Sequence, residues 1–79
     1  MISQKIEFES LAHQHIDSLY THAIELEPDM PHVEELVQQT FMKAFNSFSN
    51  FHRKDDFETW LIGLLEDVFQ TRGRQRHAA

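Results

Sequence analysis

Apolar residues recur every three or four positions along three stretches of the chain. These stretches run from about residue 5 to 27, from about 32 to 48 and from about 56 to 72. Such spacing places apolar side chains on one stripe of an α-helix. We therefore predict three amphipathic helices, with a polar loop at 49–55 before the third helix and a basic tail at 72–79 after it.

Local residues mark where these helices begin and end. Glu27 precedes a proline, and the residue before a proline is pushed out of the helical region, so the first helix should end there. Pro31 suits the first turn of the second helix. Asp55 or Asp56 is expected to cap the third helix, and Gly73 is expected to end or fray it.

No stretch alternates apolar and polar residues with period two for long enough to form a strand. The fold class is therefore all-α, and the three stripes should pack against one another as a small three-helix bundle in a single domain, 1–79. If Phe41 or Trp60 is buried, its replacement by alanine should cost about 3 to 5 kcal/mol. Five aromatic residues should supply much of the buried area: Phe41, Phe45, Phe48, Trp60 and Phe69.

Charge is distributed unevenly along the chain. All thirteen acidic residues lie before Thr71, and the four basic residues that oppose them there leave residues 1–71 with a net charge of −9. A protein that binds duplex DNA by itself usually presents a basic face, because neutralising phosphates supplies most of its affinity. Taken alone, this acidic body should bind DNA poorly.

The composition also bears on the compartment. Cysteine is absent, which excludes disulfide frameworks and thiolate metal sites and fits a reducing environment. The first twenty residues lack the apolar run of a signal peptide, and no run in the chain approaches membrane-spanning length. We expect a cytoplasmic protein that does not contact a membrane.

Enzymatic and metal sites find little support in the sequence. His13 and His15 would point about 200° apart on a helix, and His15 and His22 share a face without an acidic ligand at metal spacing. The serines lack a base and an orienting acid at a recognisable spacing, and two glycines are too few for a phosphate-binding loop. We expect a protein that is not an enzyme and has no metal site or cofactor.

One surface feature stands apart from the expected core. The face of the second helix opposite its apolar stripe carries Glu35, Gln38, Gln39 and Asn46, interrupted by Met42. Protein-recognition surfaces often have this character, because amides and methionine adapt to a partner at modest desolvation cost. The pattern indicates a protein-binding face.

Segments of the amino-acid sequence resemble those of a known protein family. The chain reads VEELVQQTFMKAFNSFSNF from Val33 to Phe51 and, after a short polar loop, FETWLIGLLEDVF. These segments resemble region 2 of the extracytoplasmic-function (ECF) sigma factors of bacterial RNA polymerase, which reads approximately AEDLVQETFLKAW and then FRAWLYRIARNTF. Upstream, FESLAHQHIDSLYTHAIELEPD is similar to the first helix of that family. The resemblance runs from about Phe8 to Arg76.

The resemblance implies a role in transcription initiation. In that family, the polar face of the second helix docks on the clamp coiled coil of the largest polymerase subunit, and the matching residues here are Glu35, Gln38, Gln39 and Met42. The loop before the third helix and the outer face of that helix capture the unstacked non-template strand of the minus-ten promoter element. This requires a pocket for a flipped base and cations along the strand. The candidates are Phe51, His52, Arg53, Lys54, Arg72, Arg74 and Arg76.

The chain also departs from the family pattern. Gln39 stands where the family has glutamate, which removes a charge but keeps a hydrogen-bond acceptor, so docking should survive. On the third helix, Gly63, Glu66 and Asp67 replace two arginines and an asparagine. Two anions on a surface expected to face DNA would repel its phosphates and oppose strand capture.

Three interpretations follow from the resemblance. The chain is the region 2 subunit of a split, two-protein sigma factor of the RsoA type, in which a second small protein with a helix-turn-helix reads the upstream promoter element. Alternatively, it is a domain excised from a longer sigma factor. The third interpretation is a sigma mimic or decoy, which binds polymerase or an anti-sigma factor and never contacts DNA. In the first two, promoter DNA is bound only together with polymerase.

Overall fold

The computed structural model describes residues 4–51 and 56–78, with side chains up to residue 72. No strand occurs in these two ranges, so the predicted all-α fold is confirmed. The chain forms three long helices and one short 3-10 turn: α1 (Gln4–Leu26), α2 (Met30–Ser47), η1 (Phe48–Asn50) and α3 (Phe57–Ala78). No helix within the described ranges combines the length and the apolar character needed to cross a membrane.

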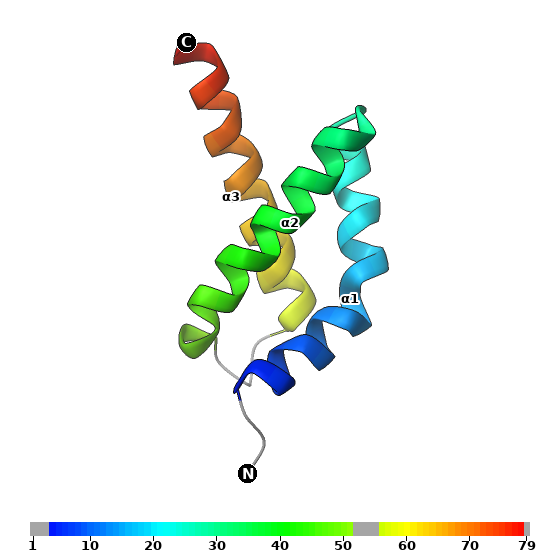
Figure 1. Cartoon of the computed structure of the whole chain (residues 1–79), viewed down its shortest axis with the longest axis vertical. Coiled ribbons are helices and arrows are strands. Elements are labelled where there is room, and N and C mark those ends of the chain that lie inside the picture. The colour runs from blue at the N-terminus through cyan, green and yellow to red at the C-terminus, as the bar shows by residue number, and fades with distance from the viewer. Residues whose placement is uncertain (1–3, 52–55, 79) are drawn as a thin grey trace.

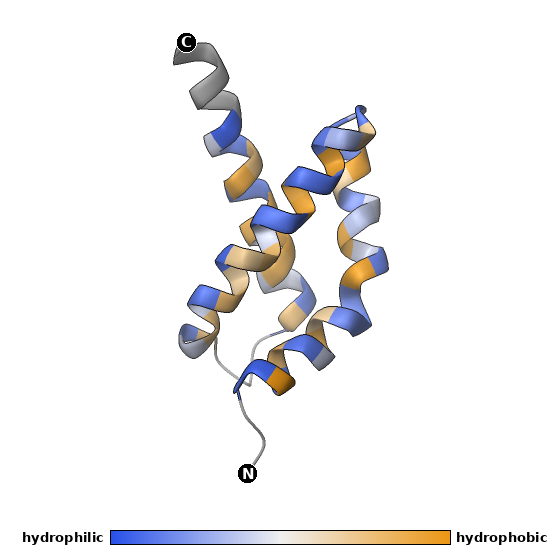
Figure 2. Cartoon of the chain, in the orientation of Figure 1, coloured by the Kyte–Doolittle hydropathy of each residue, from blue (hydrophilic) through white to orange (hydrophobic). Residues whose placement is uncertain are grey.

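The three helices pack against one another around a single core. Figure 1 shows α1 and α2 meeting at a tight corner, with α3 behind α2 and its last turns projecting past the other two helices. Hydrophilic and hydrophobic residues alternate turn by turn along each helix (Figure 2), as amphipathic packing requires. The molecule measures 46 × 23 × 18 Å, because the end of α3 extends its longest axis.

Phe48 lies at the centre of the aromatic packing. Its ring is 1% exposed, and its centroid lies 5.3 Å from that of Phe8 and 5.9 Å from that of Phe51. Phe57 and Trp60 approach the same ring, each at 6.4 Å. Aliphatic side chains from all three helices complete the core, namely Leu19, Val33, Leu36, Val37, Leu61, Leu65 and Val68.

The distribution of aromatic residues differs from the prediction. Phe45 is 43% exposed, so it does not belong to the core as expected. Phe41, Trp60 and Phe69 are only partly buried, and they pack against the core from its edge. Phe48 is buried as expected, and the other fully packed rings are Phe8, Phe51 and Phe57. The reason is geometric: Phe45 lies one residue after the buried Ala44, about 100° further around α2, so it lies away from the centre of the buried stripe.

The third helix is longer than predicted. It continues through Gly73 to Ala78, so Gly73 neither ends the helix nor separates a non-helical tail from it. A glycine inside a helix costs about 1 kcal/mol relative to alanine, and the neighbouring arginine and glutamine residues favour the helical conformation. One unfavourable residue among favourable ones does not stop the helix.

A polar cluster forms the corner between α1 and α2. The Nδ1 atom of His32 lies 3.0 Å from a carboxylate oxygen of Asp29 and 3.9 Å from one of Glu27. The backbone N–H of Val33 donates to the carbonyl oxygen of Asp29, which makes the first hydrogen bond of α2 at 2.9 Å. Pro31 lies in the first turn of α2, as its fixed φ favours. The corner thereby fixes where α2 begins.

Candidate interaction surfaces

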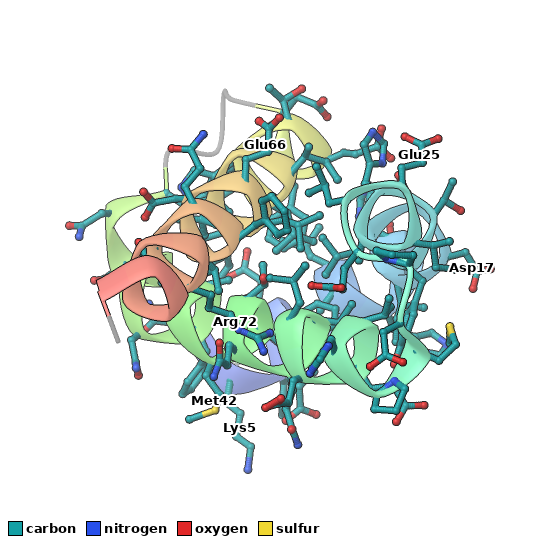
Figure 3. All side chains as sticks on the ribbon, turned by 90° about the horizontal axis from the view of Figure 1, so that it is seen from above. Lys5, Asp17, Glu25, Met42, Glu66 and Arg72 are labelled. Atoms are coloured by element: carbon teal, nitrogen blue, oxygen red, sulfur yellow. The ribbon has the colours of Figure 1, made fainter. Side chains whose placement is uncertain are left out.

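Four residues form an exposed strip along α2, which we call the α2 outer face: Glu35, Gln38, Gln39 and Met42. Their spacing of three and four residues places them on the side opposite the buried residues of the same helix. Met42 is 63% exposed, and Figure 3 shows its side chain directed away from the bundle. The structure therefore brings these residues onto one accessible surface.

Two hollows flank the α2 outer face. The first, the α1–α2 groove, has a volume of about 430 Å³ and is lined by Ile16, Tyr20, Glu34, Val37, Gln38 and Phe41. The second lies between α2 and α3, has a volume of about 290 Å³ and is lined by Gln39, Lys43, Val68, Thr71 and Arg72. Gln38 and Gln39 thus stand on the two edges of the same exposed strip.

Arg72 lies against α2 rather than pointing into solvent. One guanidinium nitrogen donates to a carboxylate oxygen of Glu35 at 3.3 Å, and another donates to the backbone carbonyl of His32 at 3.4 Å. The Arg72 side chain is only 17% exposed, while that of Glu35 is 54% exposed. A residue expected at the DNA surface is therefore paired with a residue expected at the polymerase surface. No feature of the local sequence indicated this pair, because 37 positions separate the two residues.

Asp67 also faces α2, where its carboxylate pairs with Lys43. Its charge is therefore compensated within the protein, contrary to the expectation that it repels phosphates from an outward surface. Glu66 is exposed, and Figure 3 shows it on the side of α3 away from Met42. Gly63 is exposed as well, with open space where a Cβ would stand. Among the three departures on α3 from the family pattern, only Glu66 places an anion on the outer side of the helix.

The predicted DNA-contacting residues occupy different environments. Phe51 is 8% exposed, with its ring centroid 5.5 Å from that of Phe57 and 5.0 Å from that of Trp60. In this position the ring packs against the start of α3 and is not accessible to a base. The other loop candidates, His52, Arg53 and Lys54, lie outside the described residues. Arg74 and Arg76 lie on the last turns of α3, beyond the described side chains.

Asp56 caps the N-terminus of α3, at one of the two positions predicted for the cap. Its carboxylate accepts hydrogen bonds from the Thr59 hydroxyl at 2.7 Å and from the Thr59 backbone N–H at 3.2 Å. These bonds stabilise the ionised form, so they hold the pKa of the Asp56 carboxyl below its ordinary value of 3.8, the Thr59 hydroxyl contributing most. The cap anchors α3 directly after the loop that carries the predicted DNA contacts.

This cap predicts a pH-dependent contribution to stability. A carboxyl whose pKa is lowered on folding stabilises the fold fully above its ordinary pKa, and the contribution is lost as the pH falls below about 3.8. At neutral pH, Asp56→Ala should lower the thermal midpoint by a few degrees, whereas Asp56→Asn should change it little because asparagine also caps helices. Thermal unfolding followed by circular dichroism at neutral pH and at acid pH would measure both effects. An advantage of the wild type over Asp56→Ala that persists unchanged in acid would contradict this assignment.

His15 and His22 of α1 make local contacts. His15 Nδ1 donates to the Leu11 carbonyl at 2.9 Å, and its ring packs against Phe57 at 5.3 Å. His22 Nδ1 donates to the Ser18 carbonyl at 3.0 Å. Within the described parts of the chain, no three residues of the types His, Cys, Asp and Glu come together in a way that could hold a metal ion. The remaining candidate binding surfaces are the exposed strip on α2 and the outer side of α3.

Residues 11–78 match the family model described as sigma-70 region 2. The chain is 34% identical over 76 residues to the ECF RNA polymerase sigma factor SigE of Mycolicibacterium smegmatis, an alignment that covers 91% of this chain and 29% of that protein. It is 38% identical over 45 residues to a probable RNA polymerase sigma factor of Haemophilus influenzae, covering 52% of this chain and 23% of that protein. The chain thus spans less than a third of the length of these relatives. No solved structure gives a significant match.

Proposed function

Because the chain belongs to the sigma-70 region 2 family, we propose that it acts in transcription initiation by binding the core of RNA polymerase through the α2 outer face. The observation that supports this assignment most directly is the accessibility of the four residues that match the docking positions of the family. Glu35, Gln38, Gln39 and Met42 are all exposed and adjacent. The partner surface is the clamp coiled coil of the largest polymerase subunit.

The chemistry of this face suits a protein partner. Two amides and a carboxylate supply donors and acceptors that a partner can pair, and the Met42 side chain supplies an adaptable apolar contact. None of the four residues belongs to the core, and the Glu35–Arg72 pair ties this face to α3. The function is therefore one of binding rather than catalysis.

We propose that DNA is contacted only within the complex with polymerase. Residues 1–71 carry a net charge of −9, and one of their anions, Glu66, is exposed on the outer side of α3. Phosphates are repelled by such a body, so the affinity for DNA must be supplied mainly by polymerase. The loop cations Arg53 and Lys54 and the basic end of α3 would then contact the non-template strand of the minus-ten element, where they assist melting.

The preferred form of this proposal is the split sigma factor, in which a second small protein with a helix-turn-helix reads the upstream promoter element. The test is transcription in a purified system containing core polymerase, this chain and candidate second proteins from the same cell. We expect transcripts only when all three components are present. Unchanged transcription after omission of this chain would exclude the proposal.

A second candidate is a decoy that binds polymerase or an anti-sigma factor without opening DNA. The exposed Glu66 and the engagement of Arg72 with Glu35 favour it, because both reduce the positive charge available to DNA. A decoy would bind core polymerase and inhibit transcription by another sigma factor. Measuring promoter opening in the same binding reactions separates the two functions.

The loop cations provide a further prediction. Arg53→Ala with Lys54→Ala should reduce promoter opening by about tenfold or more, while binding to core polymerase should change little, because cations on the strand act after docking. Opening is measured with a fluorescent base in the minus-ten element, and binding is measured by anisotropy. The matched control, Arg53→Lys with Lys54→Arg, keeps both charges and should open DNA nearly normally. If binding and opening decline together in the alanine variant, these cations serve docking or folding instead.

A further inference from the structure

We propose that the α1–α2 groove binds an amphipathic helix of a partner protein, with an apolar stripe and a basic flank. The groove borders the α2 outer face and shares only Gln38 with it, and this inference goes beyond the proposed docking on polymerase. Its floor is formed by Ile16 and Tyr20 of α1 and by Val37 and Phe41 of α2. Glu34 and Gln38 are exposed at its rim.

The groove continues as an apolar strip toward the corner of α1 and α2. Ile24 is 49% exposed and lies four residues after Tyr20, on the same side of α1. Met30 is also 49% exposed and lies four residues before Glu34, on the groove side of α2. At the other end, the rings of Phe8 and Phe45 meet at 5.4 Å and bring the two helices together. The apolar surface is therefore a strip between two helices, bounded at one end by the Phe8–Phe45 contact and at the other by the corner that joins α1 to α2.

The length of this strip matches a helical ligand. From Met30 to Phe41 it follows α2 for about 17 Å, at 1.5 Å per residue, which corresponds to about three helical turns. A helix with apolar residues at positions i, i+3, i+4 and i+7 presents a stripe of this kind. Large apolar side chains exposed along such a strip lose contact with water when this stripe covers them.

The negative charge at the rim of the groove favours a partner helix with a basic flank. The rim carries the carboxylate of Glu34, and Asp17 lies three residues before Tyr20 on the exposed side of α1 (Figure 3). Neither residue pairs with a lysine or arginine in the described part of the chain, where Lys43 and Arg72 are held on the α3 side of α2. A partner with lysine or arginine beside its apolar stripe would be attracted to this rim. A second copy of this chain would bring the same excess of acid, so a different, basic protein is the better occupant.

The position of the groove bears on regulation. Gln38 belongs both to the groove and to the α2 outer face, so the helical partner and polymerase would meet at this residue. Occupancy of the groove would therefore affect docking on polymerase. A binding test in the absence of polymerase keeps the two proposals separate.

The experiment uses two synthetic peptides of about 14 residues, designed as helices of three to four turns. Both carry leucine at positions i, i+3, i+4 and i+7, and they differ only in having lysine or glutamate beside this stripe. Binding to the full chain is measured by fluorescence anisotropy and mapped by amide chemical shifts. We expect the lysine peptide to bind with a Kd in the range of about 10 to 100 µM. The glutamate peptide should bind at least about tenfold more weakly.

Two charge reversals then locate the site. Glu34→Lys should weaken the lysine peptide about tenfold, whereas Glu25→Lys, on the side of α1 away from α2 (Figure 3), should have little effect. Shift changes should gather at Ile16, Tyr20, Val37 and Phe41. Equal weakening by both variants, shifts spread over the whole surface, or no binding at millimolar peptide would overturn the inference. Binding of the wild-type chain to core polymerase, measured separately, shows whether the proposed function fails independently.

Discussion

Replacing Phe48 by alanine should remove most of the stability of the fold at room temperature. The ring is 1% exposed and contacts Phe8, Phe51, Phe57 and Trp60, so its removal empties the point where α1, η1 and α3 meet. Truncation of a buried phenylalanine costs about 3 to 5 kcal/mol. A domain of this size has a stability of only about 5 kcal/mol or slightly more, so little would remain.

The matched control is Phe45→Ala, which removes the same atoms from the same region of the chain. Phe45 is 43% exposed and its ring meets only that of Phe8 among the described rings, so we expect a loss of about 1 kcal/mol. Urea unfolding followed by circular dichroism measures both variants. If Phe45→Ala destabilises the protein as much as Phe48→Ala does, the aromatic centre has been assigned to the wrong residue.

Reversing the charge character of the α2 outer face should abolish most of the affinity for polymerase. In the variant Glu35→Lys with Gln38→Lys, two cations replace an anion and an amide on an exposed strip, so a partner surface that complements the strip is repelled. We expect the Kd for core polymerase to rise by at least about tenfold. The helical circular dichroism spectrum should persist, because both side chains are exposed. Binding is measured with labelled protein and core polymerase in the absence of DNA.

The control for this variant is Glu66→Lys with Gln70→Lys, which makes the same change in net charge on the outer side of α3. Both residues are exposed, and Glu66 lies on the opposite side of the molecule from Met42 (Figure 3). We expect nearly normal binding to polymerase. If the two double variants lose affinity to the same extent, the effect reflects overall charge, and the α2 outer face is not the docking surface.

The three helices were predictable because their signals are local. Apolar residues spaced three and four positions apart define each stripe, and Pro31 and Asp56 mark where α2 and α3 begin. The end of α3 was not predictable in the same way. Gly73 is a weak signal that tolerant neighbours override, so the helix continues beyond it.

Packing between distant segments was harder to predict. Phe45 and Phe48 are both apolar positions of the second stretch, yet one is largely exposed and the other is buried. Phe45 lies one residue after the buried Ala44, about 100° further around α2, and a list of apolar spacings does not separate the edge of a stripe from its centre. Phe51 was expected to contact DNA, but it packs against Phe57 and Trp60 of α3 and is buried.

The α2 outer face was predictable as an exposed strip, because exposure follows from helical spacing once the apolar stripe is known. Its electrostatic partners were not. The contacts Glu35–Arg72 and Lys43–Asp67 join residues on different helices, and charged residues carry no periodic signal that would pair them. Binding of polymerase by the α2 outer face is a prediction. Binding of DNA by the loop cations is a second one.

The ion pair between Glu35 and Arg72 also couples two surfaces that lie on different helices. A basic partner that takes hold of Glu35 must draw it away from Arg72, which leaves the guanidinium group more available to a phosphate. Thermodynamic reciprocity requires the converse with the same free energy: a phosphate that attracts Arg72 makes Glu35 easier for the basic partner to bind. Through this single contact, binding at either surface would favour binding at the other.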